Sequence, residues 1–213
     1  MTSSSFGCLP ALQILHSKDL VNWSIVSAAV PASLPPHTDV TPQHGNRVWA
    51  PCIRHHNGEF YIFWGDPDQG IFMTKAKDVK GPWCEPVLVK AAKGIIDTIP
   101  LWDEDGRVYL AHAYAGSRAG LKSVIAVCEL SADATRTISP SRIVFDGHEH
   151  MKLAKDRSST SATDIIISSI RLVVFLQAGR SYCVRKTYTD RMNGKTCWHK
   201  ATALSTDLIR EAG

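Results

Sequence analysis

The sequence predicts an all-β fold made of repeated antiparallel sheets. Short apolar or alternating segments separated by turn residues run through the first 151 of the 213 residues, as expected for strands joined by tight turns. Two stretches recur: HSKDLVNW (16–23) is echoed by TKAKDVKGPW (74–83), and HNGEFYIFW (56–64) by EDGRVYLAHA (104–113). Offsets of 48 to 60 residues between such segments are typical of β-propeller blades.

Each expected strand has its own local signal. Asn57-Gly58 and Asp105-Gly106 suit the tight turns of β-hairpins, so 52–65 and 99–113 are expected to be hairpins. Trp23 and Trp83 hold equivalent places after the repeated turns, and both are expected to pack between neighbouring blades. Single strands are expected at 12–17, 71–76, 123–130 and 141–147, and a polar, proline-containing loop over 31–46.

The composition changes near residue 151. All eleven prolines and eleven of the fourteen glycines lie before it. Residues 1–151 carry 13 Lys and Arg against 15 Asp and Glu, whereas residues 152–213 carry 11 against 5, a balance of +6. The chain is therefore expected to divide into a β-rich part, 1–151, and a basic, proline-free tail, 152–213, that lacks the residues turns need.

Several classes of protein are disfavoured by what the sequence lacks. The sequence contains no run of eighteen apolar residues, so no membrane span is predicted. The N-terminus lacks the basic and apolar regions of a signal peptide. The six cysteines show no CxxC spacing, which disfavours a zinc ribbon or a dense disulfide scaffold. The basic residues of the tail are dispersed, so no nucleic-acid partner is predicted. Compartment and oligomeric state have no signal in the sequence.

Five segments occur in an order found in a known family: HSKDLVNW, VWAPCIRHHNGEFYIFWG, KGPW, GIIDTIPLWDEDGRVYL and VFDGHEH. Together they resemble glycoside hydrolase family 43 over residues 3–150. Members of that family are five-bladed β-propellers that cleave β-xylosidic or α-L-arabinofuranosidic linkages in plant polysaccharides. The resemblance implies an incomplete five-bladed propeller with about two to three recognisable blades, and an oligo- or polysaccharide substrate.

The chemistry of the family needs three carboxyl groups at the mouth of the central channel. An aspartate acts as general base on water, a glutamate protonates the departing sugar oxygen, and a third aspartate orients this acid and tunes its pKa. Because these enzymes invert the anomeric centre, acid and base stand far enough apart to admit the water. In the family, the base lies in the first strand of blade one, the third aspartate in an IDP motif, and the acid in an EGP motif.

The resemblance places one of these three carboxylates in the chain. Asp97, in Ile96-Asp97-Thr98, matches the pKa-tuning aspartate, with Thr98 in place of the family's proline. Taken alone, Asp97 would be interpreted as capping a turn at a strand end; the surrounding motif favours the functional role. The counterpart of the base would precede Met1, and no EGP follows His150. General base and general acid are therefore expected to be absent from this chain.

A substrate-binding role is predicted for three residues before the first hairpin. Trp49, in VWAP, matches an aromatic near the sugar subsite, where an indole can stack on a sugar face; packing between blades is the alternative interpretation. Gln43 and His44 just precede it and could hydrogen-bond sugar hydroxyls. No cofactor or metal site is predicted, since His55 and His56 have no third ligand. Intact relatives could hold calcium in the channel, and the expected ligand segment has no match here.

The tail is expected to be translated from a shifted reading frame. Read one nucleotide early with codon degeneracy left open, Ser159 to Ser169 is compatible with FYKRNGYYYIF, a hairpin of the same Asn-Gly type. Residues 181–190 are likewise compatible with VVLRSKNIYG, a third copy of the turn that contains Asp19 and Asp78. A divergent tail in a single frame is the alternative.

The sequence therefore predicts a piece of an inverting glycoside hydrolase for xylan- or arabinan-type polysaccharides, with negligible turnover of its own. A catalytically dead propeller that still binds sugar near Trp49 is the first alternative. A nucleic-acid binder that uses the basic tail is the second, and it ranks last because its charges are dispersed.

Overall fold

The computed structural model describes residues 1–30, 45–150, 188–189 and 196–197, and these confirm the all-β prediction. Two four-residue helices, α1 (Gly116–Ala119) and α2 (Gly147–His150), interrupt the strands within these ranges. None of the described helices is long and apolar enough to span a bilayer. The strands are β1 (Ala11–His16), β2 (Ser24–Val30), β3 (Trp49–His56), β4 (Glu59–Asp66), β5 (Gly70–Ala76), β6 (Val87–Ala91), β7 (Ile95–Trp102), β8 (Val108–Tyr114), β9 (Val124–Leu130), β10 (Arg142–Asp146), β11 (Tyr188–Thr189) and β12 (Thr196–Cys197).

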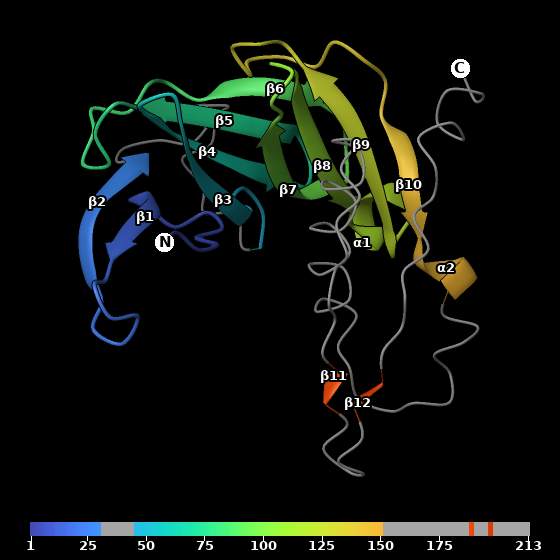
Figure 1. The fold of residues 1–213 in the computed structure, drawn as a ribbon, viewed down its shortest axis with the longest axis horizontal. Helices are drawn as coiled ribbons and strands as arrows, with labels where there is room; N and C mark the ends of the chain where they lie inside the picture. The colour runs from blue at the N-terminus through green and yellow to red at the C-terminus, as the bar shows by residue number, and fades with distance from the viewer. Residues whose placement is uncertain (31–44, 151–187, 190–195, 198–213) are drawn as a thin grey trace.

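The main sheets are successive blades of an incomplete propeller. β3-β4-β5-β6 form one four-stranded antiparallel sheet, the second blade, and β7-β8-β9-β10 form another, the third blade. β1 and β2 pair into a two-stranded first blade, which a bridge between Phe6 and Val48 joins to the second. Figure 1 shows the three sheets following one another along the chain, from blue through green to yellow. The repeats at 16–23 and 74–83 fall at equivalent places in consecutive blades, which confirms the propeller interpretation.

The two predicted hairpins form, with different turns. β3 and β4 meet at Asn57 and Gly58, whose φ angles of 48° and 77° are those of a two-residue primed turn. The β7–β8 connection is longer, because the N–H of Asp103 donates to the carbonyl of Arg107 and closes a five-residue loop. Within that loop only Gly106 has a positive φ, 84°. The second hairpin therefore turns around Asp105 and Gly106 as predicted, within a loop that is longer than a two-residue turn.

The core lies between consecutive blades because β4 is buried on both faces. In a strand, successive side chains point to opposite sides. Ile62 and Trp64 pack with Leu12 and Ile14 of the first blade, in a cluster between the first and second blades. Tyr61 and Phe63 belong to a second cluster, which joins the second and third blades and also contains Met73, Ile95, Leu110 and Leu130.

The two repeated tryptophans differ in their surroundings. Trp83 packs against the cluster between the first and second blades, as expected. Trp23 is 38% exposed and donates its indole N–H to the carbonyl of Leu20, so it closes its own turn. Trp23 is not among the side chains that pack against the core clusters of the described residues, so its packing between blades stays a prediction.

Candidate functional site

Asp97 lies in an irregularity of β7, the first strand of the third blade. The pairing of β7 with β8 shifts register between Ile96 and Ile99, and Asp97 within this bulge has a φ of 54°. An L-amino acid adopts this left-handed conformation at a cost, which aspartate and asparagine bear better than most. Bulges of this kind commonly redirect a side chain next to a functional site.

Burial dominates the electrostatics of Asp97. The side chain is half-buried, and desolvation raises the pKa of its carboxyl above the ordinary value of 3.8. Burial is the only cause of this shift, so no described cation compensates the charged form. Asp97 therefore holds its proton more readily than an aspartate in water does.

Asp97→Asn is expected to stabilise the chain by about 1 kcal/mol at neutral pH, since it removes an uncompensated charge and keeps the side-chain shape. Asparagine also tolerates the left-handed backbone found here. Urea unfolding of both chains followed by circular dichroism measures the difference. Equal or lower stability of the variant would contradict the desolvation argument.

Contacts between the second and third blades bring Trp49 and Asp97 to the same end of both sheets. Trp49 is the first residue of β3 and pairs with Gly65 at the end of β4. A Cβ on Gly65 would lie 2.8 Å from the Cα of Ile96, the residue before Asp97. The indole N–H of Trp49 donates to the carbonyl of Gly45 at 2.8 Å. The structure thus supports Trp49 and Asp97 as parts of one region.

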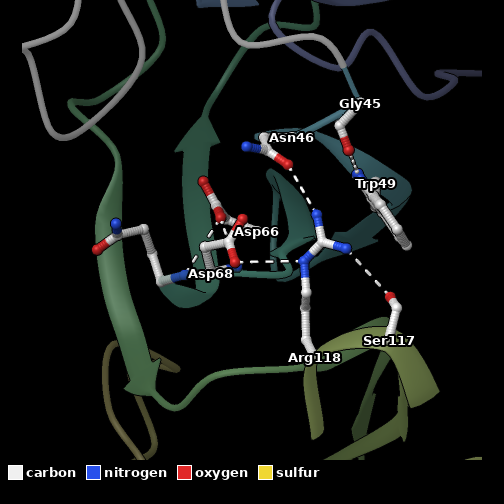
Figure 2. Close-up of polar contacts among 8 residues, drawn as sticks. Gly45, Asn46, Trp49, Asp66, Asp68, Ser117 and Arg118 are labelled. Atoms are coloured by element: carbon white, nitrogen blue, oxygen red, sulfur yellow. Dashed lines mark hydrogen bonds and ion pairs between the residues drawn. The ribbon is translucent and has the colours of Figure 1, made fainter.

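Arg118 of α1 lies beside Trp49 and was not singled out by the sequence analysis (Figure 2). Its guanidinium donates to the Asp68 carboxylate at 3.3 Å, to the Asn46 side-chain oxygen at 3.0 Å and to the Ser117 hydroxyl at 3.1 Å. The same group lies over the indole of Trp49, 6.0 Å from the ring centroid. The sequence signal was weak, because a single arginine after a strand is common on protein surfaces.

Asp66 supports the turn between β4 and β5. It is 2% exposed, and one carboxylate oxygen accepts the backbone N–H groups of Asp68 and Gln69 at 2.9 and 3.2 Å. Burial raises the pKa of Asp66, while these hydrogen bonds and the charge of Arg47 oppose the rise. Because its hydrogen bonds go to its own turn, Asp66 positions Asp68 for Arg118.

Two of the predicted binding residues, Gln43 and His44, lie outside the described residues. Within the described part of the chain, no group of three or more His, Cys, Asp or Glu side chains is placed to hold a metal ion.

Comparison with known proteins identifies the family to which this arrangement of blades belongs. Residues 1–161 match the profile of glycosyl hydrolases family 43. The chain belongs to this family. A xylan β-1,4-xylosidase structure from Bacillus halodurans superposes with a TM-score of 0.58 at 26% identity, covering 68% of this chain and 29% of the other. The fold is thus an incomplete five-bladed propeller of the family 43 type.

Two curated relatives are a xylosidase/arabinosidase and a β-xylosidase. It is 31% identical over 159 residues to a xylosidase/arabinosidase of Butyrivibrio fibrisolvens, covering 69% of this chain and 29% of the relative. It is 28% identical over 154 residues to a β-xylosidase of Bacillus subtilis, covering 68% of this chain and 28% of the relative. This family 43 chain therefore spans less than a third of the length of either relative.

Thr98, the residue after Asp97, is expected to be a local source of instability. Its side chain is 1% exposed, and its hydroxyl finds no hydrogen-bond partner among the described residues. Thr98→Val is expected to stabilise the chain by about 1 kcal/mol, because an unsatisfied buried hydroxyl is removed at nearly constant shape. Thr74→Val is the matched control: the Thr74 hydroxyl donates to the Cys84 carbonyl at 2.6 Å, so this change is expected to destabilise. Thermal unfolding of the two variants should shift in opposite directions, and a decrease for both would contradict the assignment.

Proposed function

We propose that the chain is part of an inverting glycoside hydrolase that acts on xylosyl or arabinofuranosyl linkages, with Asp97 as the carboxylate that orients the general acid. The observation that carries the proposal is a half-buried carboxyl with a raised pKa, held in a β-bulge at the end of the blades where Trp49 lies. A carboxyl in such surroundings can hydrogen-bond a neighbouring acid and raise the pKa of that acid by its own charge. Asp97 thus acts on the acid and not on the sugar bond.

Trp49 supplies the apolar contact in this proposal. An indole ring offers a flat face to the C–H groups of a pyranose or furanose, and binding there fixes the sugar relative to the carboxyl groups. The names of the relatives, xylosidase and arabinosidase, support these two classes of sugar.

The 213-residue chain alone is expected to be inactive. Proton donation to the leaving oxygen and activation of water each contribute about 10²- to 10⁴-fold, and we assign neither group to this chain. Purified chain should release no p-nitrophenol from the β-xyloside or the α-L-arabinofuranoside above the rate of an Asp97→Asn chain. Release that Asp97→Asn abolishes would overturn the assignment of an inactive fragment.

A binding-only propeller is the second candidate, favoured by the presence of Trp49 without an acid and base. It predicts saturable binding to arabinoxylan, measured by calorimetry, that Trp49→Ala abolishes. Trp23→Ala is the matched control, because Trp23 is also a partly exposed indole and closes its own turn in the first blade. No binding at millimolar sugar would remove this candidate.

We further propose that the basic tail, 152–213, is out of frame, as the composition and the codon readings indicate. The same reading applied to Ala154 through Arg157 permits Glu-Gly-Pro, the family's general-acid motif, if the codons are GCG, AAG, GAC and CGN. The acid would then be encoded in the gene and lost from the protein by one nucleotide. Sequencing codons 145–160 tests this directly: these four codons with an added or missing base nearby are expected. Other codons, or an unambiguous single frame, would refute it.

A further inference from the structure

We propose that Arg118 is a positioning residue, which fixes the orientation of the Trp49 ring relative to β7 and Asp97. The inference extends the proposed sugar site and in that respect rests on it. We call Arg118 and its contacts with Trp49, Asn46, Asp68 and Ser117 the clamp, and its geometry is independent of any ligand. Figure 2 shows the guanidinium of Arg118 between the indole of Trp49 and the turn that carries Asp66 and Asp68.

The three hydrogen-bond acceptors of Arg118 belong to three separate segments. Asn46 precedes β3, Asp68 lies in the turn between β4 and β5, and Ser117 belongs to α1. A planar guanidinium with donors in fixed directions can satisfy such a set only in one orientation. The Arg118 side chain is 29% exposed and that of Asp68 33%, so solvent only partly screens the ion pair. The orientation of the guanidinium is therefore set before any ligand arrives.

A fixed guanidinium in turn restrains the indole. The cation lies over the ring face of Trp49, an attractive arrangement that also makes this face unavailable to a sugar. The ring of Phe6 meets the indole edge-on at a centroid distance of 6.5 Å and an angle of 79°. The indole N–H is held by the Gly45 carbonyl. These contacts restrict stacking of a sugar to the part of the indole that Arg118 leaves open.

The clamp also ties Trp49 to the strand that carries Asp97. The N–H of Ala115, which precedes α1, donates to the carbonyl of Gly94 at 2.8 Å, one residue before β7 begins. A Cβ on Gly94 would lie 2.6 Å from the side chain of Ala119, so α1 rests directly on this segment. Arg118 thus connects the aromatic residue of the second blade to the carboxylate of the third.

The test measures the contribution of Trp49 to fluorescence, without any sugar. Acrylamide quenching is recorded for the full chain and for Trp49→Phe, each with Arg118 intact and with Arg118→Ala, so that the differences isolate Trp49. Arg118→Ala is expected to raise the quenching constant of Trp49 and shift its emission, with circular dichroism unchanged. Arg118→Lys keeps the charge without the fork of donors, and it is expected not to restore the original values.

Arg107→Ala is the control, because it removes the same charge from an exposed arginine in the β7–β8 loop. Unchanged quenching of Trp49 in a folded Arg118→Ala chain would overturn the clamp, as would full rescue by lysine. Should Arg118→Ala not fold, Asp68→Asn removes the ion pair at constant shape and is expected to raise the quenching constant of Trp49 in the same way.

If the chain binds arabinoxylan, Arg118→Ala is also expected to weaken binding by about tenfold. Absence of any sugar binding would remove the binding-only candidate and leave the clamp standing on the fluorescence result.

Discussion

Gly65→Ala is expected to lower the free energy of unfolding by about 3 kcal/mol, because the second and third blades meet too closely at this residue to admit a side chain. The added Cβ would lie 2.8 Å from the Cα of Ile96 and 3.1 Å from the carbonyl oxygen of Ile95. Both atoms belong to the backbone of β7, so a rotamer change cannot relieve the contact. The blades would have to separate, and Asp97 would move away from Trp49.

Urea unfolding followed by circular dichroism measures this loss, with Gly106→Ala as the control. Gly106 also lies next to β7, and it has open space around its Cα but a φ of 84°. Its replacement is therefore expected to cost about 1 kcal/mol, from backbone strain alone. Equal losses for the two variants would show that close packing at Gly65 contributes nothing beyond ordinary glycine effects.

Lowering the pH from 6.5 to 4 is expected to destabilise the chain by about 3 kcal/mol through His112 alone. Burial, reinforced by the charge of Lys90, lowers the pKa of His112 from 6.5 to about 4, although the Ala113 carbonyl partly opposes the shift. In the neutral ring, Nε2 lies 2.8 Å from the Ser141 hydroxyl and accepts its hydrogen bond when Nδ1 carries the proton towards Ala113. A pKa difference of about 2.5 corresponds to about 3 kcal/mol.

The direction of this pH dependence follows from which state binds the proton more readily. Between pH 6.5 and 4 the unfolded chain takes up a proton at His112 that the folded chain does not accept, so stability falls as the pH falls. Above pH 6.5 the contribution is fully present, and below pH 4 it is lost. Glu59 and Asp133, whose pKa values are lowered, add to acid destabilisation only below their ordinary values of 4.5 and 3.8. The raised pKa of Asp97 acts in the opposite direction, since its contribution is lost as the pH rises.

Thermal unfolding at half-unit pH steps tests the role of His112. His112→Gln keeps a hydrogen-bonding group for Ser141 without a titrating ring, and it is expected to flatten the curve between pH 6.5 and 4.5. His148→Gln, at an exposed histidine that contacts Asp146, is the matched control and should leave the slope in place. If the unfolding temperature of His112→Gln still falls between pH 6.5 and 4.5, groups other than His112 cause the pH dependence.

The sequence predicted best what depends on neighbouring residues. The Asn57-Gly58 turn and the alternation on both sides of it specify the β3–β4 hairpin by local chemistry alone. β2 and β6 were missed, because these strands have many exposed or half-buried positions and lack an alternating apolar pattern. Repetition along the chain located the blades even where single strands were weak.

In the candidate site, too, local sequence predicted some features and missed those that depend on packing. Asp97 was predicted as a site residue because a motif surrounds it, whereas its bulge and its raised pKa arise from pairing with β8 and from burial. Arg118 was missed because its partners Asp68 and Asn46 lie 50 and 72 residues away in sequence. Such contacts depend on how two blades pack, which no local pattern encodes.

The backbone at Asp97 also bears on how a protein of this kind could change its role during evolution. Aspartate and asparagine are the side chains that best tolerate its left-handed geometry, and their codons differ by one base. A lineage can therefore exchange the carboxylate for an amide without reshaping the strand, and this exchange is expected to raise stability. If Asp97 orients the general acid as proposed, this exchange would remove hydrolysis while stabilising the fold, so keeping the carboxylate would require selection for turnover.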